Sequence, residues 1–272
     1  MPGISLPFDD FMANAVMAGT IVAIVAGAVG YVLVLRGQAF AGHALSHIGF
    51  TGATGAVLVG LPPLWGLVLM TVAGGVGMGF LGERAGERDV AIGIVLSAAL
   101  GFGLLFLHFF TASATQATAL LFGNIFGVEV EAIWALLGLG LVCLVALGVI
   151  ARPLLFASLQ PELAEACGVP MRLVSVLFLA IVGLAVAECV QVVGVLLVFA
   201  LMVGPAAAAQ RWTGRILPGA GLSIAVALAV TWLGLALADW TDWPVSFWIS
   251  LLSASVYLLA CLPLRRIGDA AA

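Results

Sequence analysis

Two histidines spaced four residues apart are the side chains best placed for chemistry. His43 and His47 lie in the segment Gly42-His-Ala-Leu-Ser-His-Ile-Gly49. On a helix, residues at this spacing project from one face, with Cβ atoms about 5–6 Å apart. Neutral imidazole is a common ligand of zinc and similar borderline metals. The pair therefore predicts a metal-binding site, and the alternative is that both rings only hydrogen-bond to neighbouring helices.

The same pair falls deep within an apolar segment. Counting about 1.5 Å per residue from Arg36, His43 lies about 10 Å and His47 about 16 Å into a membrane. These depths approach the middle of a hydrocarbon core about 30 Å thick. Ionisable groups at such depth are costly, face the interior of a helix bundle and mark ion or substrate pathways. We therefore expect the pair to contact a transported metal ion such as Zn²⁺, and we expect no permanently bound cofactor.

The elements that position this pair must be membrane helices. Of the 272 residues, 64% are hydrophobic and 8% are charged, whereas soluble domains carry roughly 25% charged residues. At about 20 residues per span, the chain holds at most about ten spans. No stretch is polar enough to form a separate soluble domain. We expect a single transmembrane domain over residues 1–272, an all-α polytopic membrane bundle.

Charged residues and Pro/Gly pairs divide the chain into about nine apolar runs. With the N-terminus outside and the C-terminus inside, all nine arginines fall on the cytoplasmic side, as the positive-inside rule requires. The mixed stretch 111–130 could instead hide a short re-entrant helix. The expected spans are 11–35, 39–60, 64–82, 90–110, 131–151, 217–238 and 245–263, with two more between Arg172 and Arg211 that turn at Glu188 to Gln191.

Acidic residues gather on the predicted outer face, and one histidine lies near its rim. They are candidates for guiding metal to the pathway: His108, Glu129, Glu131, Glu188, Asp239 and Asp242. All thirteen acids fall at or near predicted loops. An ion-coupled secondary metal transporter, the alternative class, usually places carboxylates within its spans, so this pattern disfavours it.

Two further features concern moving parts. The polar insert 160–170 reads as a short cytoplasmic helix with Pro161 in its first turn and Gly168 at its end. The alternative is a solvated connector. Gly204-Pro205 interrupts a predicted span, and proline removes a backbone hydrogen bond from a helix. This pair is a candidate hinge or only a shape feature.

The sequence gives little support to an enzymatic function. The chain contains no lysine, and a P-loop needs its lysine to reach the phosphates, so any ATP hydrolysis must belong to another chain. Ser46 and His47 are adjacent and point about 100° apart on a helix. They cannot form a nucleophile–base pair, and we do not expect an enzyme.

The sequence resembles the permease subunits of bacterial zinc and manganese ABC importers. The resemblance runs over most of the chain through short motifs in the same order. They are Val34-Leu-Arg36-Gly37, Gly42-His-Ala-Leu-Ser-His-Ile-Gly49, Ile92-Gly-Ile94, Leu121-Phe-Gly-Asn-Ile-Phe-Gly-Val128, Ala164-Glu-Ala-Cys-Gly-Val169, Val192-Val-Gly-Val-Leu-Leu197 and Pro205-Ala-Ala207.

The resemblance implies a homodimeric, multi-pass permease of the bacterial inner membrane. It implies two ATP-binding cassette ATPase subunits inside, a periplasmic or extracellular metal-binding protein outside, and no nucleic acid partner. The 160–170 insert would be the coupling helix that docks the ATPase, through Glu162, Ala164, Glu165 and Gly168. Many family members carry aspartate where this chain has His43, and imidazole in place of a hard oxygen ligand favours zinc over manganese.

Overall fold

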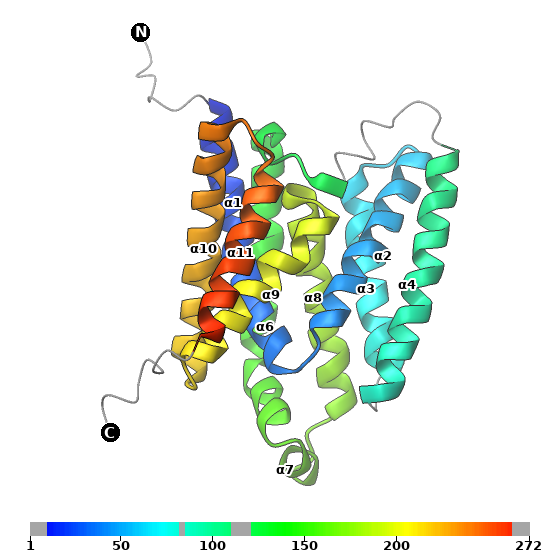
Figure 1. Cartoon of the computed structure of the whole chain (residues 1–272). Helices are drawn as coiled ribbons and strands as arrows, with labels where there is room; N and C mark the ends of the chain where they lie inside the picture. The colour runs from blue at the N-terminus through cyan, green and yellow to red at the C-terminus, as the bar shows by residue number, and fades with distance from the viewer. Residues whose placement is uncertain (1–9, 82–84, 110–120, 263–272) are drawn as a thin grey trace.

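The computed structural model describes residues 10–81, 85–109 and 121–262, and all regular structure in these ranges is helical (Figure 1). The helices are α1 (Asp10–Leu35), α2 (Ala39–Leu58), α3 (Pro63–Leu81), α4 (Ala85–His108), the short 3₁₀ helix η1 (Ile125–Gly127), α6 (Val130–Leu159), α7 (Pro161–Ala166), α8 (Met171–Val193), α9 (Val195–Trp212), α10 (Ile216–Thr241) and α11 (Val245–Cys261). The expectation of an all-α bundle is confirmed.

Six helices in the described residues are long and apolar enough to cross a membrane: α1, α3, α6, α8, α9 and α10. The apolar part of α4, Ile92–Phe106, and helix α11 are shorter. The chain is therefore a multi-span protein. The total of nine spans remains a prediction, and part of the mixed stretch 111–130, residues 111–120, lies outside the described residues.

Charge separates between the two ends of the bundle. Helix α7 projects from one end, whereas α1 begins at the other (Figure 1). The directions of α1, α6 and α9 place Arg36, Arg152 and Arg211 at the α7 end. Glu129 and Asp242 lie at the opposite end. This relative sorting fits the expected topology, and which end faces the cytoplasm remains a prediction.

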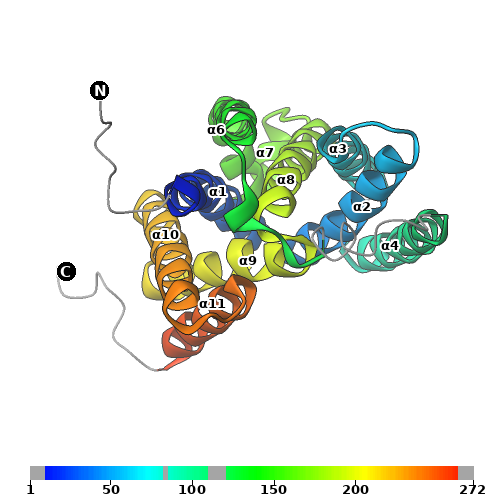
Figure 2. The same cartoon turned by 90° about the horizontal axis from the view of Figure 1, so that it is seen from above.

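Helix α8 forms the centre of the bundle. It packs against α3, α6 and α1 and also contacts α2 and α9, as the view along the bundle shows (Figure 2). Its closest approach is to α3. A side chain at Gly75 would overlap the backbone of Leu179, and one at Gly183 would overlap the backbone of Thr71. Small residues of this kind let membrane helices pack with their backbones close together.

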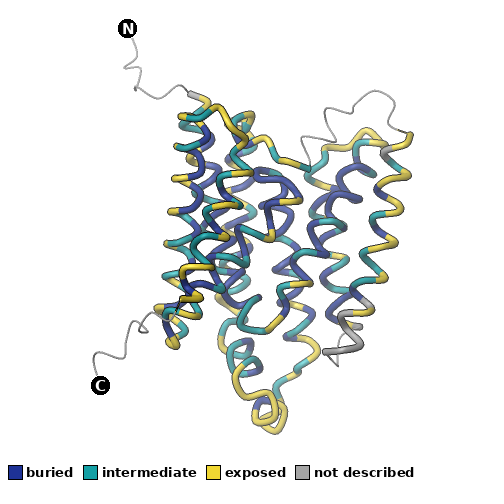
Figure 3. Tube along the Cα trace, viewed as in Figure 1, coloured by how far each residue is buried: buried dark blue, intermediate teal, exposed yellow. Residues whose placement is uncertain are grey.

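The outer surface of the bundle is apolar, as a lipid-facing surface must be. Buried residues concentrate toward the interior, and exposed positions follow the outer sides of the helices (Figure 3). Large aliphatic side chains on α3 and α6 are exposed, including Leu69 at 69%, Leu141 at 64% and Val149 at 76%. In a soluble protein a continuous surface of this type would be a liability, and in a bilayer it is the expected exterior.

Two predicted helix boundaries are wrong. The run ending at Arg152-Pro153 continues to Leu159, because a proline inside a helix removes one hydrogen bond without necessarily ending it. The turn expected at Glu188 to Gln191 lies instead at Gly194, whose φ of 80° suits glycine and ends α8. Glu188 consequently belongs to the body of α8.

Candidate functional site

Helix α2 brings the two predicted metal ligands together. The ring centroids of His43 and His47 lie 4.8 Å apart, with their planes nearly perpendicular at 85°. Both side chains are half-buried, and the residues between them, Ala44, Leu45 and Ser46, are buried. The i, i+4 spacing therefore places both rings on one accessible face of an otherwise packed helix.

The hydrogen-bond alternative finds no support at these two rings. Within the described residues, neither imidazole has a hydrogen-bond partner, whereas the Ser46 hydroxyl donates to the backbone oxygen of His43 at 2.7 Å. Rings that served only to bond neighbouring helices would show such partners. Free ring nitrogens on a half-buried face are instead available to an ion.

The pair cannot complete a metal site alone. The described residues contain no group of three or more histidine, cysteine, aspartate or glutamate side chains that could hold a metal ion. Zinc usually takes four ligands, so two imidazoles leave two positions for water or for ligands from elsewhere. An incomplete site of this kind suits brief contact with a moving ion better than permanent binding.

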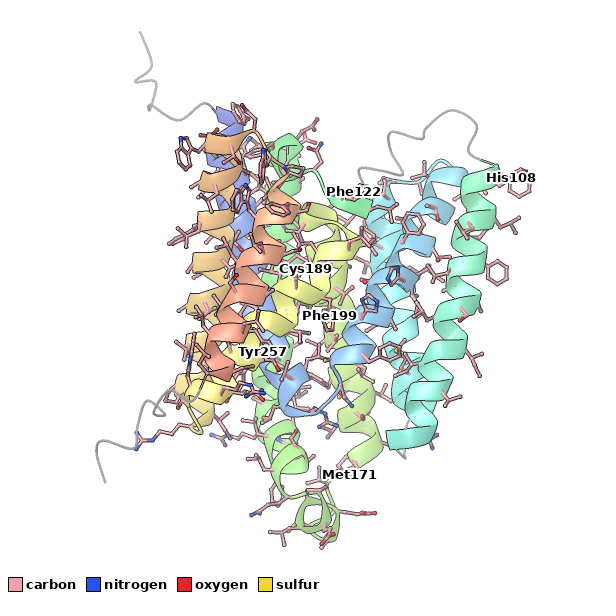
Figure 4. All side chains as sticks on the ribbon, viewed as in Figure 1. His108, Phe122, Met171, Cys189, Phe199 and Tyr257 are labelled. Atoms are coloured by element: carbon pink, nitrogen blue, oxygen red, sulfur yellow. The ribbon has the colours of Figure 1, made fainter. Side chains whose placement is uncertain are left out.

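Aromatic rings flank the pair, and the sequence offered no signal for one of them. Phe199 of α9 lies with its ring centroid 5.6 Å from that of His43, and Phe40 of α2 lies at 6.4 Å. Figure 4 shows Phe199 on α9, facing the side of the bundle that holds α2. No spacing rule connects positions 43 and 199, because only the packing of α2 against α9 brings them together.

The predicted outer residues divide into two groups. Glu129, Glu131, Asp239 and Asp242 are exposed at the end opposite α7. Asp239 and Asp242 line a cavity of about 530 Å³, which also includes Asn124 and Trp243. Glu129 lines a second cavity of about 300 Å³. These four acids can contribute an attractive field for cations at this end.

His108 and Glu188 do not join those acids. His108 is exposed at the end of α4, beside Phe109 (Figure 4). Glu188 was expected on the outer face, but the structure buries it completely between helices. Glu188 is buried because α8 continues to Val193, so that this residue lies within the helix and not in the turn after it. The sequence argument that no acid lies within the spans is therefore wrong at this position.

The 160–170 insert contains the predicted short helix. Pro161 begins α7, Glu162 lies in its first turn, and Gly168 follows it with a φ of 80°. Glu162, Glu165 and Gly168 are exposed, as a docking surface requires. Ala164 is fully buried, which corrects its place on the predicted docking face. The Ala164 methyl group packs against the rest of the protein and so anchors α7.

The Gly204-Pro205 pair lies inside a continuous helix. Helix α9 runs through Pro205 to Trp212, and Gly204 lies against Ser253 of α11. The Ser253 hydroxyl donates to the backbone oxygen of Ala200 at 2.5 Å. Tight packing on α11 therefore supports α9 where proline removes a backbone bond, and a hinge movement at this point remains a prediction.

Comparison with known proteins decides the family. The profile of the ABC 3 transport family matches residues 8–263. The chain belongs to the ABC 3 transport family. Members of this family are the membrane-spanning permease subunits of ABC transporters, and this chain is accordingly a multi-pass bacterial membrane permease subunit.

Several ABC 3 relatives are similar over most of their length. The manganese transport system membrane protein MntC of Halalkalibacterium halodurans is 30% identical over 76% of this chain and 71% of that protein. The manganese import system permease protein ScaB of Streptococcus parasanguinis is 29% identical, covering 92% and 89%. The structure of PsaBC from Streptococcus pneumoniae in complex with Fab aligns with a TM-score of 0.84 at 28% identity, covering 95% and 93%.

Proposed function

We propose that this chain forms the transmembrane path of an ATP-driven importer of divalent metal ions, and that zinc is its preferred ion. The observation that carries the proposal is the pair of half-buried imidazoles of His43 and His47, whose rings have no hydrogen-bond partner among the described residues. Membership of the ABC 3 transport family supplies the transport class. The pair supplies the point at which the ion contacts the protein.

The preference for zinc rests on ligand chemistry. Imidazole suits borderline metals such as zinc, whereas manganese favours carboxylate, carbonyl and water oxygen. The two relatives above carry manganese in their names. This chain presents two nitrogen ligands on α2, and the described residues add no carboxylate to make a three-ligand group with them. Zinc should therefore be bound and transported more readily than manganese.

The proposed assembly contains further subunits. Because the chain has no lysine and thus no P-loop, an ATP-binding cassette ATPase would supply the energy and would dock at α7. A metal-binding protein would deliver the ion at the opposite end, where the four exposed acids lie. A second copy of this chain, if a twofold axis set its α2 near this one, would bring four imidazoles together.

Zinc uptake into proteoliposomes that hold the complete complex tests the proposal. His47→Gln and His43→Asn keep polar side chains but remove imidazole, and we expect each to abolish most ATP-dependent uptake. Ser255→Ala is the control, because the hydrogen bond that this partly exposed α11 hydroxyl makes within the described part of the chain goes to Leu251 of its own helix. Near-normal uptake by both histidine variants would leave the metal-contact role without support.

A secondary, ion-coupled transporter is the second candidate. The buried carboxyl of Glu188 supports it, because such transporters place ionisable groups within their spans. The two candidates differ in their energy source. Uptake that requires ATP and the partner ATPase identifies the importer, whereas uptake by the isolated chain in response to a proton or sodium gradient identifies the secondary transporter.

A further inference from the structure

The carboxyl group of Glu188 is buried where α1, α6 and α8 pack together, in space left by a glycine. The side chain is fully buried (0% exposed) and reaches from α8 to Gly140 of α6, and Val25 of α1 lies beside the same glycine. A Cβ atom at position 140 would lie 2.9 Å from Oε1 of Glu188. The glycine therefore makes the room that the carboxyl fills, and α1, α6 and α8 all contact one another here.

No group among the described residues forms a hydrogen bond with this carboxyl. Both oxygens of Glu188 are buried without a hydrogen-bond partner. Among the described residues, the titratable groups that interact with it are two thiols, Cys143 on α6 and Cys189 on α8, and the α1 side chain beside Gly140 is the apolar Val25. The Cys143 thiol donates to the backbone oxygen of Ile181 at 3.6 Å and so is directed elsewhere. Figure 4 shows Cys189 within the bundle.

The packing suits only one protonation state of this acid. An ionised carboxylate that is fully buried without a hydrogen-bond partner loses its hydration and gains nothing in return. The neutral acid, with its proton retained on oxygen, avoids most of that cost. Ionisable residues within membrane helices are uncommon and mark ion pathways and proton relays.

We propose that Glu188 is a proton-binding site of the transport cycle. The carboxyl holds a proton while α1, α6 and α8 are packed as described here. When a rearrangement of these helices admits water, the O–H bond breaks, the proton passes to water and the carboxylate remains, hydrated. Return to the packed arrangement takes the proton back. This inference rests on the proposed function, since it assumes a permease that changes conformation as it transports metal.

Infrared spectroscopy of the complete complex tests protonation directly. We expect a band from a protonated carboxyl in the resting wild-type complex at neutral pH, which disappears in Glu188→Gln and shifts in Glu188→Asp. Glu131→Gln is the spectroscopic control, because this exposed acid should contribute no such band. The band should weaken when the complex is trapped with a non-hydrolysable ATP analogue. Absence of the band at rest overturns the proposal.

Metal uptake by the same preparations tests the role in the cycle. Glu188→Gln keeps the size and neutrality of the acid but cannot release a proton, so the variant should assemble normally and lose most uptake. Ser255→Ala should transport as the wild type does. Wild-type uptake by Glu188→Gln at every pH overturns the proposal while leaving the importer intact. Failure of the wild-type complex to take up metal would count against the proposed function instead, and the infrared band would still decide protonation.

Discussion

In the proposed function, the residue at position 43 determines which metal ion is preferred. The His43 ring lies 4.8 Å from that of His47 and faces Phe199 across the α2–α9 contact. We expect His43→Asp to retain transport and to move preference from zinc toward manganese, because a carboxylate is the harder ligand. Competition between the two ions for uptake by the complete complex measures the shift. An unchanged zinc preference would show that the ring at position 43 does not contact the ion.

Single residues also show where prediction from sequence reaches its limit. The i, i+4 pair was predictable, because helical spacing alone sets its geometry. Glu188 and Phe199 were not, since the burial of one and the partner of the other depend on tertiary packing. Ala164 falls between: its helix was predicted correctly, but the direction of its side chain was not.

At the level of helices, the α9–α11 contact depends on a glycine. A methyl group at Gly204 would overlap the Ser253 hydroxyl, which is held by its bond to Ala200. We expect Gly204→Ala to destabilise the protein by about 1–3 kcal/mol through overpacking, seen as a lower thermal unfolding temperature in detergent. Gly221→Ala on α10 is the matched control, because nothing lies near that position. Equal stability of the two variants would contradict this account.

On helix α7, a residue of the proposed ATPase-docking surface adjoins a residue that is buried against the protein. Leu163 is 51% exposed, whereas Ala164 beside it is fully buried. We expect Leu163→Ser to reduce metal-stimulated ATP hydrolysis by the complete complex without changing its unfolding temperature. Ala164→Leu should instead lower that temperature, since overpacking a buried site costs about 1–3 kcal/mol. Normal coupling in Leu163→Ser would place the ATPase contact elsewhere.

The helices themselves were largely predictable, and their ends were not. Long apolar runs specify a membrane helix by composition and length, so the spans around α1, α3 and α10 fall close to their predicted ranges. The exact residue at which a helix ends depends on local backbone conformation and on tertiary packing. Pro153 lies inside α6, while Gly194 ends α8 through a positive φ that the sequence around it did not distinguish from other glycines.

For the molecule as a whole, the acidic end opposite α7 should attract metal ions from a distance through its electric field. Replacing Glu129, Glu131, Asp239 and Asp242 together with their amides should slow metal uptake more at low salt than at high salt. The reason is that electrostatic attraction extends about 30 Å at 0.01 M ionic strength but about 10 Å at 0.1 M. Initial uptake rates across a salt series measure the effect. A loss independent of ionic strength would indicate a local structural role.

The order of the helices along the chain has a consequence for biogenesis. The carboxyl of Glu188 lies beside Gly140 of α6, next to which α1 also packs, and both of these helices precede α8 in the sequence. During synthesis, which proceeds from the N-terminus, α1 and α6 can already be in the membrane when α8 leaves the ribosome. Helix α8, with its buried acid, can thus insert against helices already in the membrane rather than into lipid alone. A nascent chain arrested soon after Val193 would already contain Gly140, the residue that leaves room for the carboxyl.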